Sequence, residues 1–235
     1  MDKELKEQLD SYKVPAKAVE ILENTRVVFL VGVSGAGKNT ILKELLKTGK
    51  YKLVISHTTR KPRKNHGVLE KHGEAYHFID EEKAKEMLKN NEFIEAKIYS
   101  GNIYGTSIAE VEDAHRKRKI AISDIEVQGV SEYMKVAPSV VPVFILPPDF
   151  NTWRQRLKDR FKGLNYNWQE MKTRLSTAKA ELTDALSKDY FEFVVNDDLE
   201  RAVSAVDKIA HGELSAQKNE HARRLAQDLL AKLDA

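Results

Sequence analysis

The 235-residue chain contains no cysteine, which excludes disulfides, zinc–thiolate sites and cysteine nucleophiles. It also has little net charge, because 39 basic and 36 acidic residues leave a formal charge of +3. A general nucleic-acid-binding surface is therefore not expected, although a local anion pocket remains open. Nothing in the composition calls for an obligate protein partner.

Long hydrophobic runs are missing as well. The longest extends from Val27 to Val33, includes Gly32, and is far too short to span a bilayer. The first ten residues, MDKELKEQLD, are charged from the second position and do not resemble a signal peptide. We therefore expect a cytoplasmic protein without membrane contact, with one domain and appendages at its ends.

Short β-branched runs alternate with segments of helical periodicity. Apolar runs at 26–32, 119–125, 141–146 and 191–196 predict buried strands, and helical spacing follows the first of them. A long helix is expected near 168–185, where the apolar stripe Trp168, Met171, Leu175, Ala178, Leu182, Ala185 indicates core packing. This alternation predicts an α/β fold with a parallel sheet flanked by helices.

The stretch GVSGAGKNT lies between the first predicted strand and its helix, which is the context of a phosphate-binding loop. Glycines let backbone N–H groups approach a phosphate, and a lysine reaches its outer oxygens. The pattern predicts an ATP site formed by Gly32, Ser34, Gly35, Ala36, Gly37, Lys38, Asn39 and Thr40. Asn39 replaces the usual Ser or Thr, and its amide oxygen can still ligate Mg²⁺. Asp124 is a second candidate near the metal, with helix capping as the alternative.

Residues 51–105 differ from this pattern and are interpreted as an inserted lobe of short strands and a small helix at 81–88. The stretch SHTTRKPR carries Arg60 and Arg63, which can clamp a phosphate through forked hydrogen bonds. Tyr76 and Tyr104 can add phenolic donors. His57, His66, His72 and His77 lack a ligand spacing, so no metal site is expected there.

Several motifs in order resemble the guanylate kinase family. They are the phosphate loop, SHTTRKPR, EKHGEAYHF, NEFIEAKIYSGNIYGTS, DIEVQGV and VVNDDLERA, over about Arg26 to Ala210. The resemblance implies a P-loop NTPase-type core, an inserted mixed α/β GMP-binding lobe and a helical lid. It also implies the reaction ATP + GMP = ADP + GDP with Mg²⁺, and dGMP as a further acceptor.

The resemblance assigns roles to matching positions. Arg60, Arg63, Tyr76 and Tyr104 would hold the GMP phosphate, with Glu70 as a further polar residue of the lobe. Glu95, Ser56, Thr106 and Glu126 would read the guanine. Glu95 suits this role because a carboxylate accepts guanine's N1–H and 2-amino group together, and adenine lacks that pair.

The same resemblance makes Arg156, Arg160 and Arg174 lid arginines that meet charge on the transferred phosphoryl group. An ordinary basic helix face is the alternative. Asn196 and Asp197 would line the adenine side, although they also suit the cap of a final helix. The implied core is 26–50 and 119–210, the lobe about 51–105 and the lid about 154–176. Residues 1–25 and 211–235 are expected to be helical extensions outside the core pattern.

Four features depart from the family pattern: Asn39, a longer link KNHGVL, Glu126 in place of Asp, and a longer lid RFKGLNYNW without Gly-Thr. Two other functions compete. One is a non-catalytic guanylate-kinase-like module that grips phosphopeptides, and the intact Gly37 and Lys38 argue against it. The other is a related kinase with a different phosphorylated acceptor, which Glu95 and the paired arginines disfavour.

Overall fold

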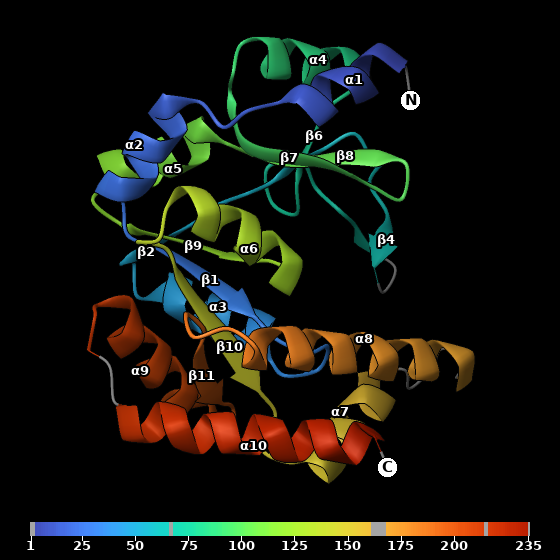
Figure 1. Cartoon of the computed structure of the whole chain (residues 1–235), viewed down its shortest axis with the longest axis vertical. Coiled ribbons are helices and arrows are strands. Elements are labelled where there is room, and N and C mark those ends of the chain that lie inside the picture. The colour runs from blue at the N-terminus through green and yellow to red at the C-terminus, as the bar shows by residue number, and fades with distance from the viewer. Residues whose placement is uncertain (1–2, 66–67, 161–167, 214–215, 235) are drawn as a thin grey trace. The chain divides into compact units, whose positions relative to one another are not determined.

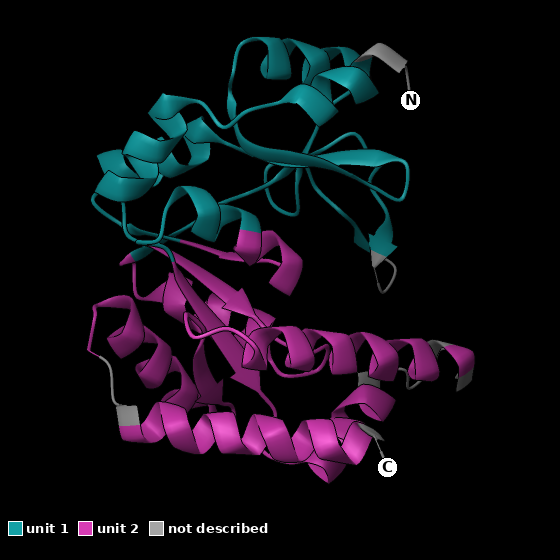
Figure 2. Cartoon of the chain, in the orientation of Figure 1, with its two compact units in different colours: residues 1–26, 51–121, 132–140 teal, residues 27–50, 122–131, 141–235 magenta. Residues whose placement is uncertain are grey.

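The computed structural model describes residues 3–65, 68–160, 168–213 and 216–234 (Figure 1). The chain forms two compact units, and each unit combines separated stretches of sequence (Figure 2). Unit 1 contains residues 1–26, 51–121 and 132–140, and unit 2 contains residues 27–50, 122–131 and 141–235.

Unit 2 contains a parallel sheet. Its strands follow the order β11-β10-β1-β9, and their bounds are β1 Val27–Val31, β9 Ile120–Asp124, β10 Val141–Leu146 and β11 Glu192–Val195. β1 pairs in parallel with β10, and β10 pairs in parallel with β11. All five side chains of β1 are buried, which explains its uninterrupted apolar sequence. The four predicted strands and the α/β class are thereby confirmed.

The helices of unit 2 are α3 Lys38–Lys47, α7 Phe150–Arg160, α8 Trp168–Leu186, α9 Leu199–Ala210 and α10 Ala216–Asp234. A further helix, α6 (Val127–Val136), divides between the two units. α3 packs on α9, and α10 lies beside α8 and β11 (Figure 1). Met171, Ala178, Leu182 and Ala185 of the predicted stripe are buried and Leu175 is half-buried. The Trp168 side chain lies outside the described part of the chain.

Unit 1 is built on a smaller mixed sheet of order β6-β3-β8-β7. Its elements are α1 Lys3–Ser11, α2 Ala16–Asn24, β2 Tyr51–Leu53, β3 His57–Thr58, β4 Lys64–Asn65, β5 Val68–Leu69, β6 His77–Phe78, α4 Glu81–Lys89, β7 Phe93–Tyr99, β8 Asn102–Ser107 and α5 Ile108–Arg116. β3 is parallel to β6 and antiparallel to β8. The longer link after Arg63 forms the antiparallel β4–β5 pair.

The β7–β8 hairpin carries a bulge that matters for the site. Its two-residue turn, Ser100-Gly101, has positive φ angles at both positions, as tight hairpin turns of this hand require. Near the other end the register shifts, so that Phe93 lies opposite Ser107 while Glu95 lies opposite Thr106. A bulge of this kind redirects a side chain relative to regular alternation.

Both terminal segments form helices, and each helix places apolar side chains in the buried core of its unit. Leu5 and Leu9 of α1 are buried in a cluster with Met87 and Phe93. The Tyr12 hydroxyl adds a 2.7 Å hydrogen bond to the Phe93 carbonyl. In α10, three buried side chains face the rest of unit 2: Ala222, Ala226 and Leu229. None of the helices in the described ranges is long and apolar enough to cross a membrane.

Candidate functional site

The glycine-rich loop joins β1 to α3 and can be built only from glycine at two positions. Gly32 has a φ of 134°, and a Cβ there would lie 2.3 Å from the Ile145 carbonyl oxygen of β10. Gly37 has a φ of 98°, and a Cβ there would lie 2.1 Å from Nδ2 of Asn196. α3 begins directly after Gly37, so the N-terminal end of this helix, where an anion is favoured, lies at the loop.

Side-chain hydrogen bonds to main-chain carbonyls fix the conformation of the loop. The Lys38 ammonium donates to the Gly32 carbonyl, so it lies folded back over the loop. Asn196 is only 7% exposed, and its Nδ2 donates to the carbonyl of Ala36 at 2.7 Å. Arg156 in turn donates to the main-chain carbonyl of Asn196 at 3.1 Å. Asn196 thus links Arg156, one of the predicted lid arginines, to the loop.

Two further side chains fasten the loop at Ser34. The indole Nε1 of the buried Trp153 donates to the Ser34 carbonyl at 2.8 Å. The Arg174 guanidinium donates to the Ser34 hydroxyl at 3.1 Å. The structure therefore brings Arg156 and Arg174 to the loop. The Arg160 side chain and residues 161–167 of the predicted lid lie outside the described residues.

The predicted metal ligands are exposed oxygen donors. Asn39 lies in the first turn of α3, and Asp124 ends β9. In the part of the chain that the structure describes, no group of three or more His, Cys, Asp or Glu side chains could hold a metal ion by itself. Magnesium usually takes only one or two protein oxygens and completes its shell with water and substrate phosphates. The exposed Asn39 and Asp124 side chains fit that use.

Glu181 was not predicted, yet it contributes charge beside the loop. The pKa of this α8 carboxyl is raised to about 7: burial is the main cause, the Lys38 ammonium opposes it, and the Glu126 carboxylate adds to it. Glu126 itself is exposed and lies in unit 2. The helical stripe that predicted α8 concerns apolar residues only, so it gave no signal for this acid.

In unit 1, Arg60 lies with two of the other predicted phosphate contacts, Tyr76 and Tyr104, and with Glu70. Its guanidinium forms a forked ion pair with Glu70, at 2.8 and 3.1 Å, and both side chains are close to fully buried. It also lies over the ring of Tyr76, 5.2 Å from the centroid, and that ring contacts Tyr104 edge-on. The hydrogen bonds that Arg60 donates to Glu70 raise the pKa of Arg60, with Tyr104 as a smaller cause. Arg63 is exposed, and its main-chain N–H donates to Glu70.

The predicted guanine-reading residues of unit 1 form a chain of hydrogen bonds. Thr106 donates to Oε1 of Glu95 at 3.0 Å, and the Ser56 hydroxyl lies 3.5 Å from that of Thr106. Burial raises the pKa of Glu95, whereas the Thr106 hydrogen bond and Lys97 lower it. The bulge in β7 places Glu95 opposite Thr106, so the contact follows from the register of the hairpin.

Three histidines of this unit contact one another. The rings of His57 and His77 lie 4.6 Å apart, and those of His72 and His77 lie 5.4 Å apart. Nε2 of His77 is 2.8 Å from a carboxylate oxygen of Glu110. Burial lowers the pKa of His57 to about 4, and His77 lowers it further. His66 lies outside the described residues.

Comparison with known proteins agrees with this geometry. The guanylate kinase family model matches residues 24–213. The chain belongs to the guanylate kinase family. It is 37% identical over 202 residues to the guanylate kinase of Schizosaccharomyces pombe, covering 85% of this chain and 96% of that protein. It is 34% identical over 201 residues to the guanylate kinase of Sus scrofa, covering 83% and 98%.

A crystal structure of guanylate kinase from Anaplasma phagocytophilum superposes with a TM-score of 0.57. The sequences are 26% identical, and the match covers 82% of this chain and 88% of that chain. The family resemblance inferred from the ordered motifs is thereby confirmed.

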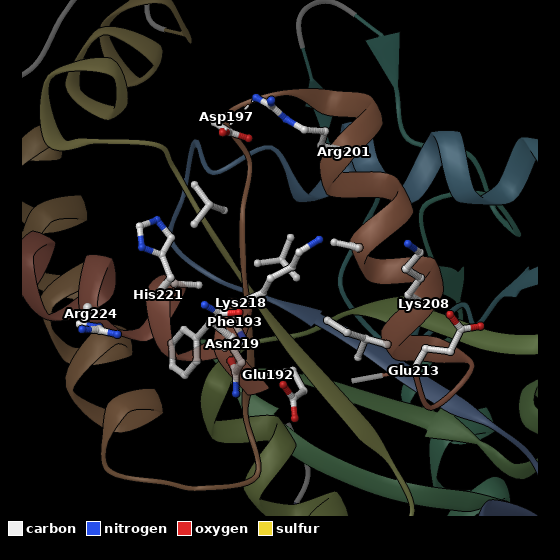
Figure 3. A pocket seen from close by; sticks show the side chains of 16 residues that line it. Glu192, Phe193, Asp197, Arg201, Lys208, Glu213, Lys218, Asn219, His221 and Arg224 are labelled. Atoms are coloured by element: carbon white, nitrogen blue, oxygen red, sulfur yellow. Dashed lines mark hydrogen bonds and ion pairs between the residues drawn. The ribbon is translucent and has the colours of Figure 1, made fainter. Parts of the chain in front are cut away.

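The end of the guanylate kinase match adjoins a hollow of about 910 Å³ formed by β11, α9 and the start of α10 (Figure 3). Asp197 lines this hollow, and its carboxylate pairs with Arg201 at 3.1 Å. The helix cap was predicted one residue too early, because Asp198 accepts the Arg201 N–H and caps α9. The neighbours Asn196 and Asp197 therefore have different contacts, and only Asn196 touches the phosphate loop.

Proposed function

We propose that this chain transfers the γ-phosphoryl group of ATP to GMP, and to dGMP as well, giving ADP and the nucleoside diphosphate. A phosphate oxygen of GMP attacks the γ-phosphorus as the bond to the β–γ bridging oxygen breaks. The observation that carries the proposal is a glycine-rich loop that Arg174 contacts at Ser34 and that Asn196, itself bonded to Arg156, contacts at Ala36, in a chain of the guanylate kinase family. Neither alternative function has such an observation in its favour.

On the ATP side, the roles follow from charge and reach. Lys38 would exchange its loop carbonyl for the β- and γ-phosphate oxygens. Arg174 lies at Ser34 and would meet negative charge on the transferred group. Arg156, which is hydrogen-bonded to the Asn196 carbonyl, would meet the same negative charge as Arg174. Arg160 is assigned to the lid by the family resemblance alone. Asn39 and Asp124 would hold Mg²⁺, which supplies charge neutralisation on the phosphates when bound.

On the GMP side, Arg60, Arg63, Tyr76 and Tyr104 would bind the phosphate. Glu70 is already occupied by the fork of Arg60, and a carboxylate does not attract a phosphate. We therefore assign Glu70 to positioning: it holds the Arg60 guanidinium over the ring of Tyr76, where it can meet the incoming phosphate.

Glu95 would read the guanine with Thr106, Ser56 and Glu126. A half-buried carboxylate whose pKa is raised by burial lacks solvation, and two guanine donors restore hydrogen bonds to it. Adenine would present a ring acceptor to the same carboxylate and lose both bonds, which gives the site its selectivity.

The domain assignment accompanying this function is a kinase domain at 26–210, with a core at 26–50 and 119–210. The GMP-binding lobe would be about 51–105 and the lid about 154–176, flanked by extensions at 1–25 and 211–235. A cytoplasmic location remains a prediction from the sequence.

A coupled assay of ATP-dependent ADP formation tests the proposal, with GMP, dGMP, AMP, UMP and CMP as separate acceptors. We expect turnover with GMP and dGMP only. Absence of turnover with every acceptor would refute the kinase assignment, and a preference for AMP would refute the role of Glu95. Lys38→Met should abolish turnover while GMP binding persists, and Glu95→Ala should chiefly raise the KM for GMP.

A further inference from the structure

Glu110 is an acid of unit 1 that none of the recognised motifs includes. It lies in the first turn of α5, and its side chain is only 14% exposed. One carboxylate oxygen, Oε2, accepts the main-chain N–H of Ile55 at 2.9 Å and lies 3.4 Å from the Lys52 ammonium. The other, Oε1, lies 2.8 Å from Nε2 of His77. Each oxygen of Glu110 therefore binds a different segment of the unit.

A main-chain hydrogen bond joins the same two segments. The His77 N–H donates to the Ser56 carbonyl at 2.9 Å, at the start of the parallel pairing of β3 with β6. Ser56 directly follows Ile55, so the chain leads from one Glu110 contact to this bond, and the His77 side chain leads back to Glu110. The three hydrogen bonds therefore close a circuit, which we call the Glu110 circuit. Neither segment can move relative to the other without breaking one of these bonds.

Neighbouring groups fix the imidazole of His77 within this circuit. An ionised carboxylate only accepts hydrogen bonds, so His77 donates through Nε2. Its imidazole contacts those of His57, at 4.6 Å, and His72, at 5.4 Å between centroids. His72 is itself held, because its Nδ1 accepts the Phe78 N–H at 3.1 Å. The donor to Glu110 thus has a defined position.

Both segments of the circuit carry a residue proposed to bind GMP. Ser56 is a proposed base contact, and its hydroxyl lies 3.5 Å from that of Thr106. Tyr76 directly precedes His77 and is a proposed phosphate contact, with the Arg60 guanidinium 5.2 Å from the centre of its ring. The circuit therefore lies between the base-binding and the phosphate-binding sides of the lobe.

We propose that Glu110 is a positioning residue for GMP: it fixes the separation between Ser56 on the base side and Tyr76 on the phosphate side. This inference rests on the proposed function. GMP joins its base and its phosphate through one ribose, so it gains both sets of contacts together only when their separation matches. Guanosine has no phosphate and does not depend on that separation. An acid that only stabilised the fold would not distinguish the two ligands.

The test compares Glu110→Ala with the unmodified chain. This variant leaves the Ile55 N–H without its acceptor and releases the His77 imidazole. We expect the KM for GMP to rise about 5- to 30-fold and the KM for ATP to stay within about twofold. The dissociation constant of guanosine, measured by NMR titration, should rise by less than about threefold, because one side of the lobe suffices to bind it. An unchanged KM for GMP, or a loss of guanosine binding as large as that of GMP, would overturn the inference.

Glu110→Gln tests whether the hydrogen bonds, rather than the charge, carry this role. The amide oxygen can accept the Ile55 N–H, and the amide NH₂ can donate to Nε2 of His77 once the imidazole proton moves to Nδ1. The circuit then remains closed, and the KM for GMP should stay within about threefold of the unmodified value. A KM as high as that of Glu110→Ala would overturn the inference. Nitrogen-15 NMR at mildly alkaline pH should show the change of tautomer, and a normal KM without that change would also overturn it.

His77→Phe opens the circuit from the other side while Glu110 keeps its bond to Ile55. It should raise the KM for GMP less than Glu110→Ala does, and it serves as the test if that variant does not fold. The two substitutions combined should raise the KM by less than the product of their separate effects, because both break the same circuit. An unchanged KM in His77→Phe, or multiplying effects, would overturn the inference.

Glu112→Ala is the matched control. Glu112 lies two residues further along α5 and pairs with the exposed Lys17 at 2.7 Å, so its removal also deletes an ion pair of this helix. This variant should leave the KM for GMP unchanged. A rise as large as that of Glu110→Ala would show that any loss of an α5 acid has this effect, and would overturn the assignment to Glu110.

Failure of this inference is distinguishable from failure of the proposed function. An unmodified chain without GMP turnover refutes the function itself and the inference with it. A chain that phosphorylates GMP with the same KM before and after Glu110→Ala retains the function and loses only the positioning role. Thermal unfolding, measured for each variant, establishes that the compared proteins are folded.

Discussion

Removing the Asn196 amide should destabilise unit 2 and weaken ATP binding together. In Asn196→Ala, the carbonyl of the fully buried Ala36 loses the donor that now lies 2.7 Å away. A buried acceptor left unsatisfied costs about 1–3 kcal/mol. We expect the free energy of unfolding to fall by about that amount, and the KM for ATP to rise because the loop is no longer held at Ala36.

Urea unfolding followed by tryptophan fluorescence measures this effect in the right unit. The chain has two tryptophans, Trp153 and Trp168, and both fall in the 141–235 stretch of unit 2. Asn151→Ala is the matched control, because that amide is exposed on α7, and its effect should stay within about 0.5 kcal/mol. If Asn196→Ala lowered the free energy of unfolding no more than Asn151→Ala does, and left the KM for ATP unchanged, the reasoning would be refuted.

The same contact predicts a coupling with Gly37. A Cβ at position 37 would meet Nδ2 of Asn196 at 2.1 Å and would also require a left-handed backbone, with φ at 98°. In Asn196→Ala the collision disappears, whereas the backbone cost of about 1–2 kcal/mol remains. Gly37→Ala should therefore cost less stability in the Asn196→Ala background than in the unmodified chain. Equal costs in the two backgrounds would show that Asn196 does not crowd this position.

Three further predictions use different readouts. Glu70→Ala should raise the KM for GMP with little change in the KM for ATP, because Arg60 loses its fork partner; steady-state kinetics with an unchanged KM for GMP would contradict the positioning role. The folded-state pKa of His57, about 4, lies below its usual 6.5, so its contribution to stability should be lost as pH falls from 6.5 to 4. In His57→Phe, urea unfolding followed by circular dichroism should show a smaller rise of the free energy of unfolding with pH between 4 and 6.5. The folded-state pKa of Glu181, about 7, lies above its usual 4.5, so its contribution to stability should be lost as pH rises from 4.5 to 7. In Glu181→Gln, urea unfolding followed by tryptophan fluorescence should no longer show this loss of stability.

The features predicted best from the sequence are those that neighbouring residues determine. The strand expected at 141–146 has those bounds in the structure, and it is buried at every position after the first, as its apolar sequence indicates. The loop shape followed from its glycines, and Gly32 and Gly37 do have the positive φ angles that require glycine. Both the strand and the loop are determined by residues that lie within the element itself.

The features that the sequence did not reveal depend on contacts between distant segments. Asn196 supports a loop carbonyl 160 residues away, and a motif position alone does not distinguish that role from helix capping. The bulge that pairs Glu95 with Thr106 depends on the register of two strands. Leu5 and Leu9 belong to a short, highly charged helix, so their burial follows from the apolar cluster they meet rather than from their own periodicity.

The pKa shifts of His57 and Glu181 also test whether the two units unfold together. His57 belongs to unit 1 and makes stability rise with pH between about 4 and 6.5, whereas Glu181 belongs to unit 2 and makes it fall between 4.5 and about 7. If both units unfold in one transition, the two contributions oppose each other, and the profile from pH 4.5 to 6.5 should be flatter than in either single variant. If the units unfold separately, the tryptophan signal of unit 2 should follow Glu181 alone and be unaffected by His57→Phe. The pH profile of this variant, measured by tryptophan fluorescence, therefore reports whether the two units share one folding transition.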